Sequence, residues 1–199
     1  MRLRSLAVAT QPIVEPVSLT IAKGHLSLLQ EQEDDDTLIV SMLSTARRLI
    51  ERRLGVALAP QQLRAKFDAT DGMGWTRGPD NVGPVVLRLP VVPVMTGGSY
   101  PVALDVDGTA VSSSTYTVDA DAGQIRFSSA PQMSDLTTLT VTYWAGQATI
   151  APQLRTAILL YVGHLYANRE AVIATGAQPV AIPMAFETLL ASESVSGRW

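Results

Sequence analysis

The sequence contains no cysteine, and this absence excludes several kinds of site at once. A chain without thiols has no disulfide bonds, no thiolate zinc site and no cysteine nucleophile. Charged residues are also few, at 17%, whereas hydrophobic residues make up 47% of the 199 residues. This balance is typical of a chain that buries a core and does not remain disordered. The length predicts one large domain, or one domain with an embellishment.

An excess of positive charge is lacking as well. Lysine and arginine number 15 against 18 acidic residues, so the formal net charge is -3 at pH 7. A strongly basic balance is the signature of a dedicated nucleic-acid-binding protein, so any contact with DNA is expected to be local. The two histidines, His25 and His164, have no neighbour at metal-ligand spacing. We therefore predict no metal and no cofactor.

Long apolar runs are absent too. The apolar run at residues 6–9 is shorter than the roughly 7 residues of a signal peptide's hydrophobic region. No run approaches the roughly 18 residues that would cross a bilayer. The sequence also has neither a phosphate-binding loop nor the glycine-flanked serine of the hydrolases. We expect a cytoplasmic protein with no membrane role and no catalytic constellation.

Hydrophobic residues recur at helical spacing toward both ends of the chain. Ser18 is placed to cap a short helix over residues 17–29. Gly55 is placed to end a longer helix, which begins after the acidic run 31–36. Pro152 marks the first turn of a third helix, and a short helical turn follows near the C-terminus. The chain therefore begins and ends with helices.

The middle of the chain changes to a period of two, which predicts β-strands. Alternation is clear at residues 63–67 and again at 139–143. Asp107–Gly108 and residues 121–123 are typical of hairpin turns, because glycine tolerates a positive φ. The predicted fold class is α+β, a bundle of three to four helices with a β-rich insertion between the second and third helices.

This pattern divides the chain into four parts. Residues 1–16 are expected to form an N-terminal arm, and residues 192–199 a C-terminal tail without periodicity. The helical body comprises residues 17–55 and 150–191. The β-rich insertion occupies residues 56–149.

Four arginines within seven residues form the densest local charge, namely Arg47, Arg48, Arg52 and Arg53. Their guanidiniums could meet phosphate or an acidic partner. The simpler interpretation for a monomer is a solvated helix face on which Glu51 pairs with Arg47 four residues before it. We therefore expect that replacing the four arginines with glutamine does not unfold the protein.

The segment 70–84 is a long loop, and loops of about 15 residues in compact domains are often functional. Trp75 and Arg77 near its tip are residue types that anchor interfaces, although Trp75 could equally cover the sheet. Three carboxylates surround the loop and could hold a hard cation, namely Asp68, Asp71 and Asp80. Their spacing matches no calcium-binding loop, so an ordinary polar loop is the simpler interpretation.

Ordered stretches along most of the chain are similar to one family when taken together. They are Val17–Leu26, Asp35–Ile39, Ala46–Gly55, Leu87–Pro93, Tyr116–Asp119, Gly123–Ile125, Val141–Gly146, Pro152–Leu160 and Tyr166–Glu170. In this order and spacing the chain resembles the head-tail connector, or adaptor, proteins of tailed bacteriophages and of the related gene transfer agent particles. Each stretch alone is weakly specific, and the resemblance covers about residues 16–191.

The resemblance implies a non-enzymatic structural protein that forms a ring, commonly of twelve subunits. Such a ring docks beneath the portal protein and offers a platform for stopper or tail proteins, while DNA passes through its centre with transient, non-specific contacts. It assembles in the host cytoplasm and then lies in the particle neck. In the family the helices form the ring body, the β insertion faces outward or toward the next component, and the C-terminal segment reaches the portal.

By this resemblance the portal contact would comprise Ser196, Gly197, Arg198 and Trp199. Trp75 and Arg77 are the candidates for a partner-facing loop. The four arginines would line the DNA channel or an inter-subunit contact. Two alternatives stay open. One is a carbohydrate-binding or hydrolytic tail component, suggested by the threonine-rich strands and the loop carboxylates; the other is a DNA-binding accessory that uses the arginines.

Overall fold

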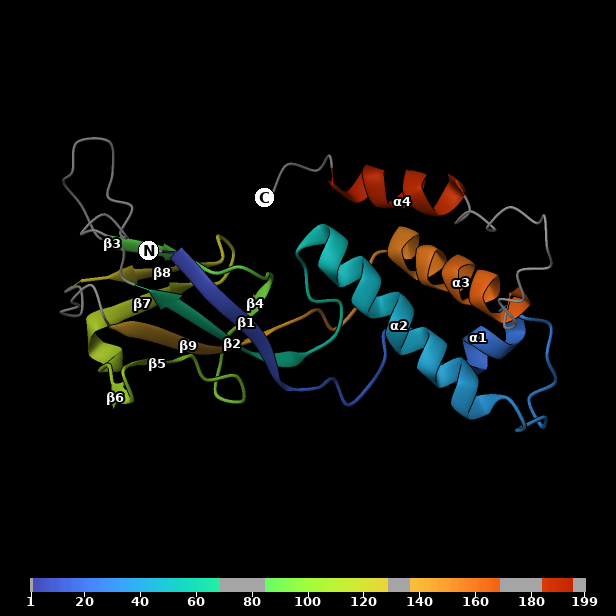
Figure 1. The fold of residues 1–199 in the computed structure, drawn as a ribbon, viewed down its shortest axis with the longest axis horizontal. Helices are drawn as coiled ribbons and strands as arrows, with labels where there is room; N and C mark the ends of the chain where they lie inside the picture. Colours follow the sequence, from blue (N-terminus) through green and yellow to red (C-terminus); the bar gives the residue numbers. More distant parts are fainter. Residues whose placement is uncertain (1, 69–84, 129–136, 169–183, 195–199) are drawn as a thin grey trace, which may run out of the picture. The chain divides into compact units, whose positions relative to one another are not determined.

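The computed structural model describes residues 2–68, 85–128, 137–168 and 184–194. These residues form four α-helices and two antiparallel β-sheets, so the predicted α+β composition is confirmed and the chain is rich in sheet. The chain divides into two compact units, which Figure 1 shows in ribbon form. The β unit comprises Met1–Ile13 and Ala59–Ala148, and the helical unit comprises Val14–Leu58 and Thr149–Trp199.

The described residues of the β unit form one sheet of six strands and one of three. The larger sheet has the order β1 (Arg2–Thr10), β2 (Gln61–Asp68), β9 (Thr138–Ala145), β5 (Ala103–Val106) and β6 (Thr109–Ala110), and β4 (Val94–Met95) also pairs with β9. The smaller sheet has the order β3 (Val85–Arg88), β8 (Gln124–Phe127) and β7 (Tyr116–Asp119). All pairs are antiparallel, as hairpin connections allow.

The alternation read from the sequence matches the burial of the strands. β2 buries Leu63, Ala65 and Phe67, and the residues between them are exposed or half-buried. β9 follows the same pattern, and its buried Tyr143 lies opposite Leu63. The Tyr143 hydroxyl accepts a hydrogen bond from the backbone N–H of Val91, which follows the smaller sheet's first strand. Each sheet therefore has one face in the core of this unit.

Both predicted hairpin turns are confirmed. Asp107 and Gly108 connect β5 to β6 with φ of 49° and 82°. Gly123 precedes β8 with φ of 59°, and its N–H donates to the carbonyl of Ala120. The sequence did not predict a strand within residues 1–16, yet residues 2–10 pair with β2 as strand β1. Two register shifts in β1 disturb the period of two, which hides the strand in the sequence.

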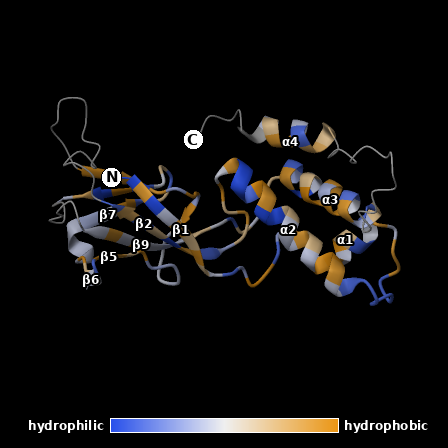
Figure 2. Cartoon of the chain, in the orientation of Figure 1, coloured by the Kyte–Doolittle hydropathy of each residue, from blue (hydrophilic) through white to orange (hydrophobic). Residues whose placement is uncertain are grey.

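In the described part of the helical unit, four helices pack around one core. The helices are α1 (Leu19–His25), α2 (Asp36–Leu54), α3 (Pro152–Ala167) and α4 (Met184–Ser194). Apolar residues of all four contribute to this core, among them Ala22, Ile39, Ile50, Ile158 and Phe186. Figure 2 shows hydrophilic residues at both ends of α2, where the acidic run precedes the helix and the arginines end it.

The helix boundaries follow the local signals. The Ser18 hydroxyl accepts a hydrogen bond from the N–H of Ile21 at the start of α1, and Pro152 is the first residue of α3. Gly55 ends α2 in the left-handed conformation, with φ of 67°. Helix α1 ends at His25, earlier than predicted, because Ser27 adopts φ of 59° and turns the chain. Helix α4 continues to Ser194, into the segment expected to be tail.

Candidate functional site

The four arginines near the end of α2 have different surroundings. Arg47 is buried, with 3% of its side chain exposed. Its Nε donates to Glu15 Oε2 at 2.7 Å, and its Nη1 donates to Glu51 Oε2 at 2.7 Å. The predicted pair with Glu51 is therefore present, but Arg47 is not on a solvated face. In this conformation its guanidinium is turned toward Glu15 and Glu51 within the helical unit.

Glu51 connects this ion pair to the chain that follows α2. Its Oε1 accepts a hydrogen bond from the backbone N–H of Leu58 at 2.9 Å. Burial raises the pKa of the Glu51 carboxyl above its ordinary value of 4.5, although the Leu58 N–H and the Arg47 guanidinium act in the opposite direction. The Glu15 carboxylate contributes to the increase, because Arg47 supplies one positive charge for two carboxylates.

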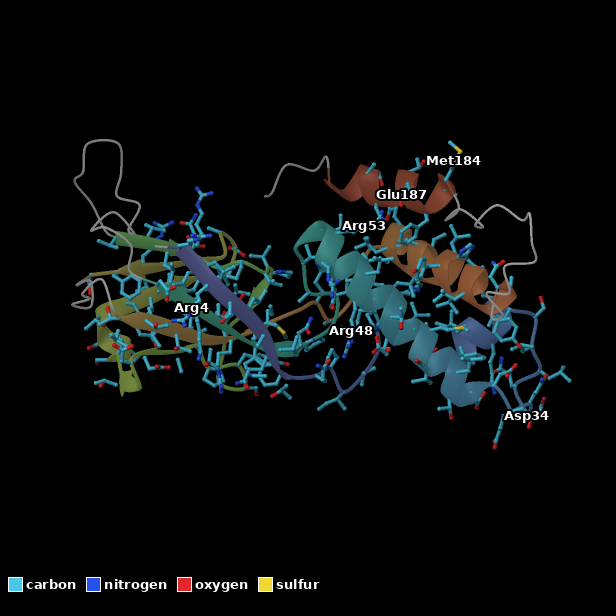
Figure 3. The ribbon with its side chains drawn as sticks, viewed as in Figure 1. Arg4, Asp34, Arg48, Arg53, Met184 and Glu187 are labelled. Atoms are coloured by element: carbon cyan, nitrogen blue, oxygen red, sulfur yellow. The ribbon has the colours of Figure 1, made fainter. Side chains whose placement is uncertain are left out.

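Arg53 lies at the other side of α2 and contacts α4. Its Nη1 donates to both carboxylate oxygens of Glu187, at 2.5 and 2.6 Å. The guanidinium carbon also lies 5.9 Å from the centre of the Phe186 ring. Figure 3 shows Arg53 and Glu187 facing each other between the two helices. Both side chains are 40% exposed or more, so solvent weakens the ion pair, and its contribution is chiefly to position α4.

Arg48 and Arg52 of α2 have exposed side chains. They are four residues apart and so share one face of the helix. The prediction of an arginine surface thus rests on these two side chains, with Arg53 at its border. Whether this surface meets DNA or another subunit stays a prediction.

The opposite end of α2 contains a cluster that sequence reasoning missed. Lys23 of α1 has 4% of its side chain exposed; it forms an ion pair with Asp36 at 2.5 Å and donates to the carbonyl of Gln30 at 3.1 Å. The Tyr166 hydroxyl of α3 donates to Asp35 at 2.5 Å. In the sequence Lys23 falls within the apolar stripe of α1, and this position is the signal that could have predicted a buried lysine with an acidic partner. Two acids of the run, Asp35 and Asp36, therefore have partners within the helical unit.

Several predicted residues lie outside the described part of the chain. These are Trp75, Arg77, Asp71, Asp80, Ser196, Gly197, Arg198 and Trp199. Of the three loop carboxylates only Asp68 is described. Its Oδ1 accepts hydrogen bonds from Arg4 and from the Thr138 hydroxyl, each at 3.4 Å.

A polar hollow of about 460 Å³ lies on the β unit. It is lined by Arg4, Ser5, Lys66, Asp105, Asp107, Gly108, Thr138 and Thr140. Asp105 accepts a hydrogen bond from the N–H of Gly108, and Asp107 accepts one from the N–H of Thr138. Asp105 therefore bonds within the turn between β5 and β6, and Asp107 bonds this turn to the start of β9; the carbohydrate-binding or hydrolytic component stays an alternative.

Metal-binding and membrane-spanning features were also sought in the described residues. Those residues contain no group of three or more potential metal ligands. His25 lies next to Gly163 of α3, and His164 lies beside the Tyr161 ring at 6.4 Å between centroids. None of the described helices combines the length and apolarity needed to cross a membrane.

Neither a family model nor a curated protein matches the chain. Solved structures that contain a similar chain are the virion of a native gene transfer agent (GTA) particle, with a TM-score of 0.67, and the neck of an empty GTA particle computed with C6 symmetry, with a TM-score of 0.68. The neck of a native GTA particle computed with C12 symmetry also contains one, with a TM-score of 0.67. In each case the identity is 20%, and the match covers 94% of this chain and 93% of the other.

These matches show that the chain shares its fold, over nearly its whole length, with a chain found in GTA particles. The structures in question are those of a virion and of particle necks. At 20% identity the likeness concerns the fold, because one fold can host several functions.

Proposed function

We propose that this protein is a structural head-tail adaptor. In this proposal, twelve copies of the chain form a ring between the portal protein and the stopper or tail components of a phage-like particle. DNA passes through the centre of the ring, and no bond is made or broken. The observation that carries the proposal is the match of 94% of the chain to a chain in necks computed with C12 and C6 symmetry.

The proposal gives each unit a part. The helical body, residues 17–55 and 150–191, forms the ring, and the β-rich insertion, residues 56–149, faces outward or toward the next component. Closed rings need two different faces that fit head to tail, and their geometry sets the copy number. The tail residues from Ser196 to Trp199 would contact the portal, and Trp75 and Arg77 would face a partner.

The exposed arginines fit a passage for DNA better than a tight binding site. Arg48 and Arg52 supply a local positive charge on a chain with a net charge of -3. Strong binding to duplex DNA requires many phosphate contacts, and each contact adds to the salt dependence. Two cations per subunit would permit transient contacts. Weak binding to duplex at about 0.15 M salt is therefore expected, whereas tight salt-dependent binding would favour the DNA-binding accessory.

The proposed function is tested by locating the chain in particles. An affinity tag on the chain, followed by electron microscopy of the purified particles, should place density in the neck as a ring with cyclic symmetry. Particles made without the chain should contain filled or empty heads that lack attached tails. Complete tailed particles formed without the chain, or a tag located away from the neck, would contradict the proposal.

A further inference from the structure

The N-terminal strand β1 carries an unusual share of the exposed apolar surface. Ten large hydrophobic side chains are exposed in the described residues, and five of them lie between residues 3 and 14. Three belong to β1, namely Leu3, Leu6 and Val8, each 41–42% exposed. Grouped apolar side chains of this kind mark interaction surfaces more often than scattered ones do.

The register places these three side chains on the core face of the larger sheet. Leu3, Leu6 and Val8 lie opposite Phe67, Ala65 and Leu63 of β2, respectively. Those three residues of β2 are buried, with 4% exposure or less. The apolar face therefore continues onto β1, but its burial does not. A further strand that extended this face would cover Leu3, Leu6 and Val8.

The backbone of β1 is open on the same side. β1 ends the strand order of the larger sheet, and within the described residues only β2 pairs with it. Its register shifts lie between Leu3 and Ser5 and between Val8 and Thr10, so residues 5–8 form the stretch without a shift. An exposed edge of this kind accepts another strand through its unpaired backbone groups. A short partner strand fits a straight stretch of four residues.

The opposite edge of the same sheet has complementary properties. β6 ends the strand order there, and it is a short strand of two residues, Thr109–Ala110. The β5–β6 hairpin contains Asp105 and Asp107 and no base, whereas β1 contains Arg2 and Arg4 and no acid. On the core face, Val106 of the hairpin lies opposite the buried Leu139 and is itself half-buried. The two edges thus differ in the sign of their formal charge and share apolar character, although Arg4 already pairs with Asp68 of its own chain at 3.4 Å.

We propose that β1 docks against the β5–β6 hairpin of a second copy of this chain. This inference rests on the proposed function, since a ring requires each copy to contact the next through two different faces. Cationic β1 lies beside the acidic hairpin, and Leu3, Leu6 and Val8 continue the neighbour's apolar face at Val106. Opposite charges at the two edges favour this pairing over the pairing of two β1 edges.

The absence of cysteine permits a direct test. Ala7 and Ala110 are exposed, and their registers with Arg64 and Asp105 place both on the solvent face. Ala7→Cys and Ala110→Cys are made in separate chains with tags of different size, mixed in equal amounts, assembled into necks and treated with a short bismaleimide. We expect a cross-linked pair that contains both tags. The matched control replaces Ala110→Cys with Thr117→Cys, an exposed position on β7, and should give no such pair.

A second variant tests the apolar row. Leu6→Asp places a charge in the contact and should weaken association between copies at least tenfold, as measured by light scattering across a concentration series. Thr117→Asp introduces the same charge on an exposed strand of the other sheet and should leave association unchanged. Circular dichroism shows whether each variant is folded, and the cysteine pair stays informative if Leu6→Asp does not fold.

The outcomes separate this inference from the function on which it rests. If wild-type copies form the neck ring but give no Ala7–Ala110 cross-link, the docking of β1 on the hairpin is wrong and the adaptor function stands. The docking of β1 is also wrong if a folded Leu6→Asp chain still forms the ring. It is likewise wrong if β1 is cross-linked to another protein and not to a second copy. If wild-type copies are absent from the neck, the proposed function itself is wrong.

Discussion

A single guanidinium, that of Arg47, connects three segments of the helical unit. It binds Glu15 near the start of the unit, lies on α2, and binds Glu51, which in turn holds the backbone of Leu58. A residue with 3% exposure and two carboxylate partners cannot be replaced without leaving buried charge. The expectation that all four arginines can be exchanged for glutamine therefore does not extend to Arg47.

Replacing this side chain should destabilise the protein markedly. We expect Arg47→Gln to lower the free energy of unfolding by about 3 kcal/mol, because it leaves Glu15 and Glu51 without their counter-charge. Arg52→Gln, an exposed residue on the same helix, should change it by less than about 0.5 kcal/mol. Chemical denaturation of both variants measures the difference. Equal stabilities would show that the buried ion pairs contribute little.

The raised pKa of Glu51 predicts a pH dependence of stability. Between this raised value and 4.5, the folded state holds a proton that the unfolded chain has released. The contribution of Glu51 to stability is therefore fully present below 4.5 and is lost as the pH rises through the raised pKa. Glu51→Gln lacks this contribution, so wild type should gain stability relative to Glu51→Gln as the pH falls from 7 toward 4.5.

Denaturation of the two proteins at several pH values measures this trend. Arg52→Gln serves as the control, because its side chain adds no titrating group in this range. A difference that stays constant with pH would contradict the assigned direction of the Glu51 shift.

At the scale of elements, the end of β9 depends on the absence of a side chain. Gly146 has φ of 145°, and a Cβ at this position would meet the backbone of Ala59 and Pro60 at 2.5 and 2.6 Å. The close approach lets the chain leaving β9 pass beside the start of β2. Backbone cannot move aside as a flexible side chain can, so this glycine is required by packing as well as by conformation.

Gly146→Ala should therefore lower the free energy of unfolding by at least about 2 kcal/mol, since strain and overpacking each cost about 1–3 kcal/mol. Gly98→Ala is a matched control, because a Cβ there meets nothing within 4 Å. Thermal denaturation measures the difference in stability between the Gly146→Ala and Gly98→Ala variants. A Gly146→Ala variant as stable as Gly98→Ala would show that the Ala59–Pro60 backbone can shift.

At the scale of the whole molecule, the proposed portal contact predicts that fold and attachment are separable. Helix α4 continues to Ser194, so the truncation that spares it removes residues 195–199. We expect the truncated chain to keep the melting temperature of the full chain and to lose attachment to the portal protein in a pull-down experiment.

A point variant sharpens this prediction. Trp199→Ala should weaken attachment to the portal, because a large aromatic residue anchors interfaces, whereas Ser196→Ala should have little effect. Unchanged attachment by the truncated chain would exclude the tail as the portal contact. A lowered melting temperature would indicate that the tail contributes to the fold.

The sequence by itself determined the features that depend on near neighbours in the chain. Ser18 caps a helix three residues away, and Gly55 ends one by its own backbone conformation. Asp107–Gly108 turns a hairpin, and the alternation of β2 and β9 assigns their core faces. These features follow from local φ and ψ preferences and from side-chain periodicity, which a single sequence displays.

Only the tertiary structure decided which charged groups are internal and which surfaces stay open. Arg47 is buried by Glu15, 32 residues earlier, and Asp35 binds Tyr166, 131 residues later. Within the described residues β1 is an edge strand because it pairs with β2 alone, and β2 lies more than fifty residues further along the chain. Local periodicity carries no record of such partners, since they meet only when the chain folds and brings distant segments together.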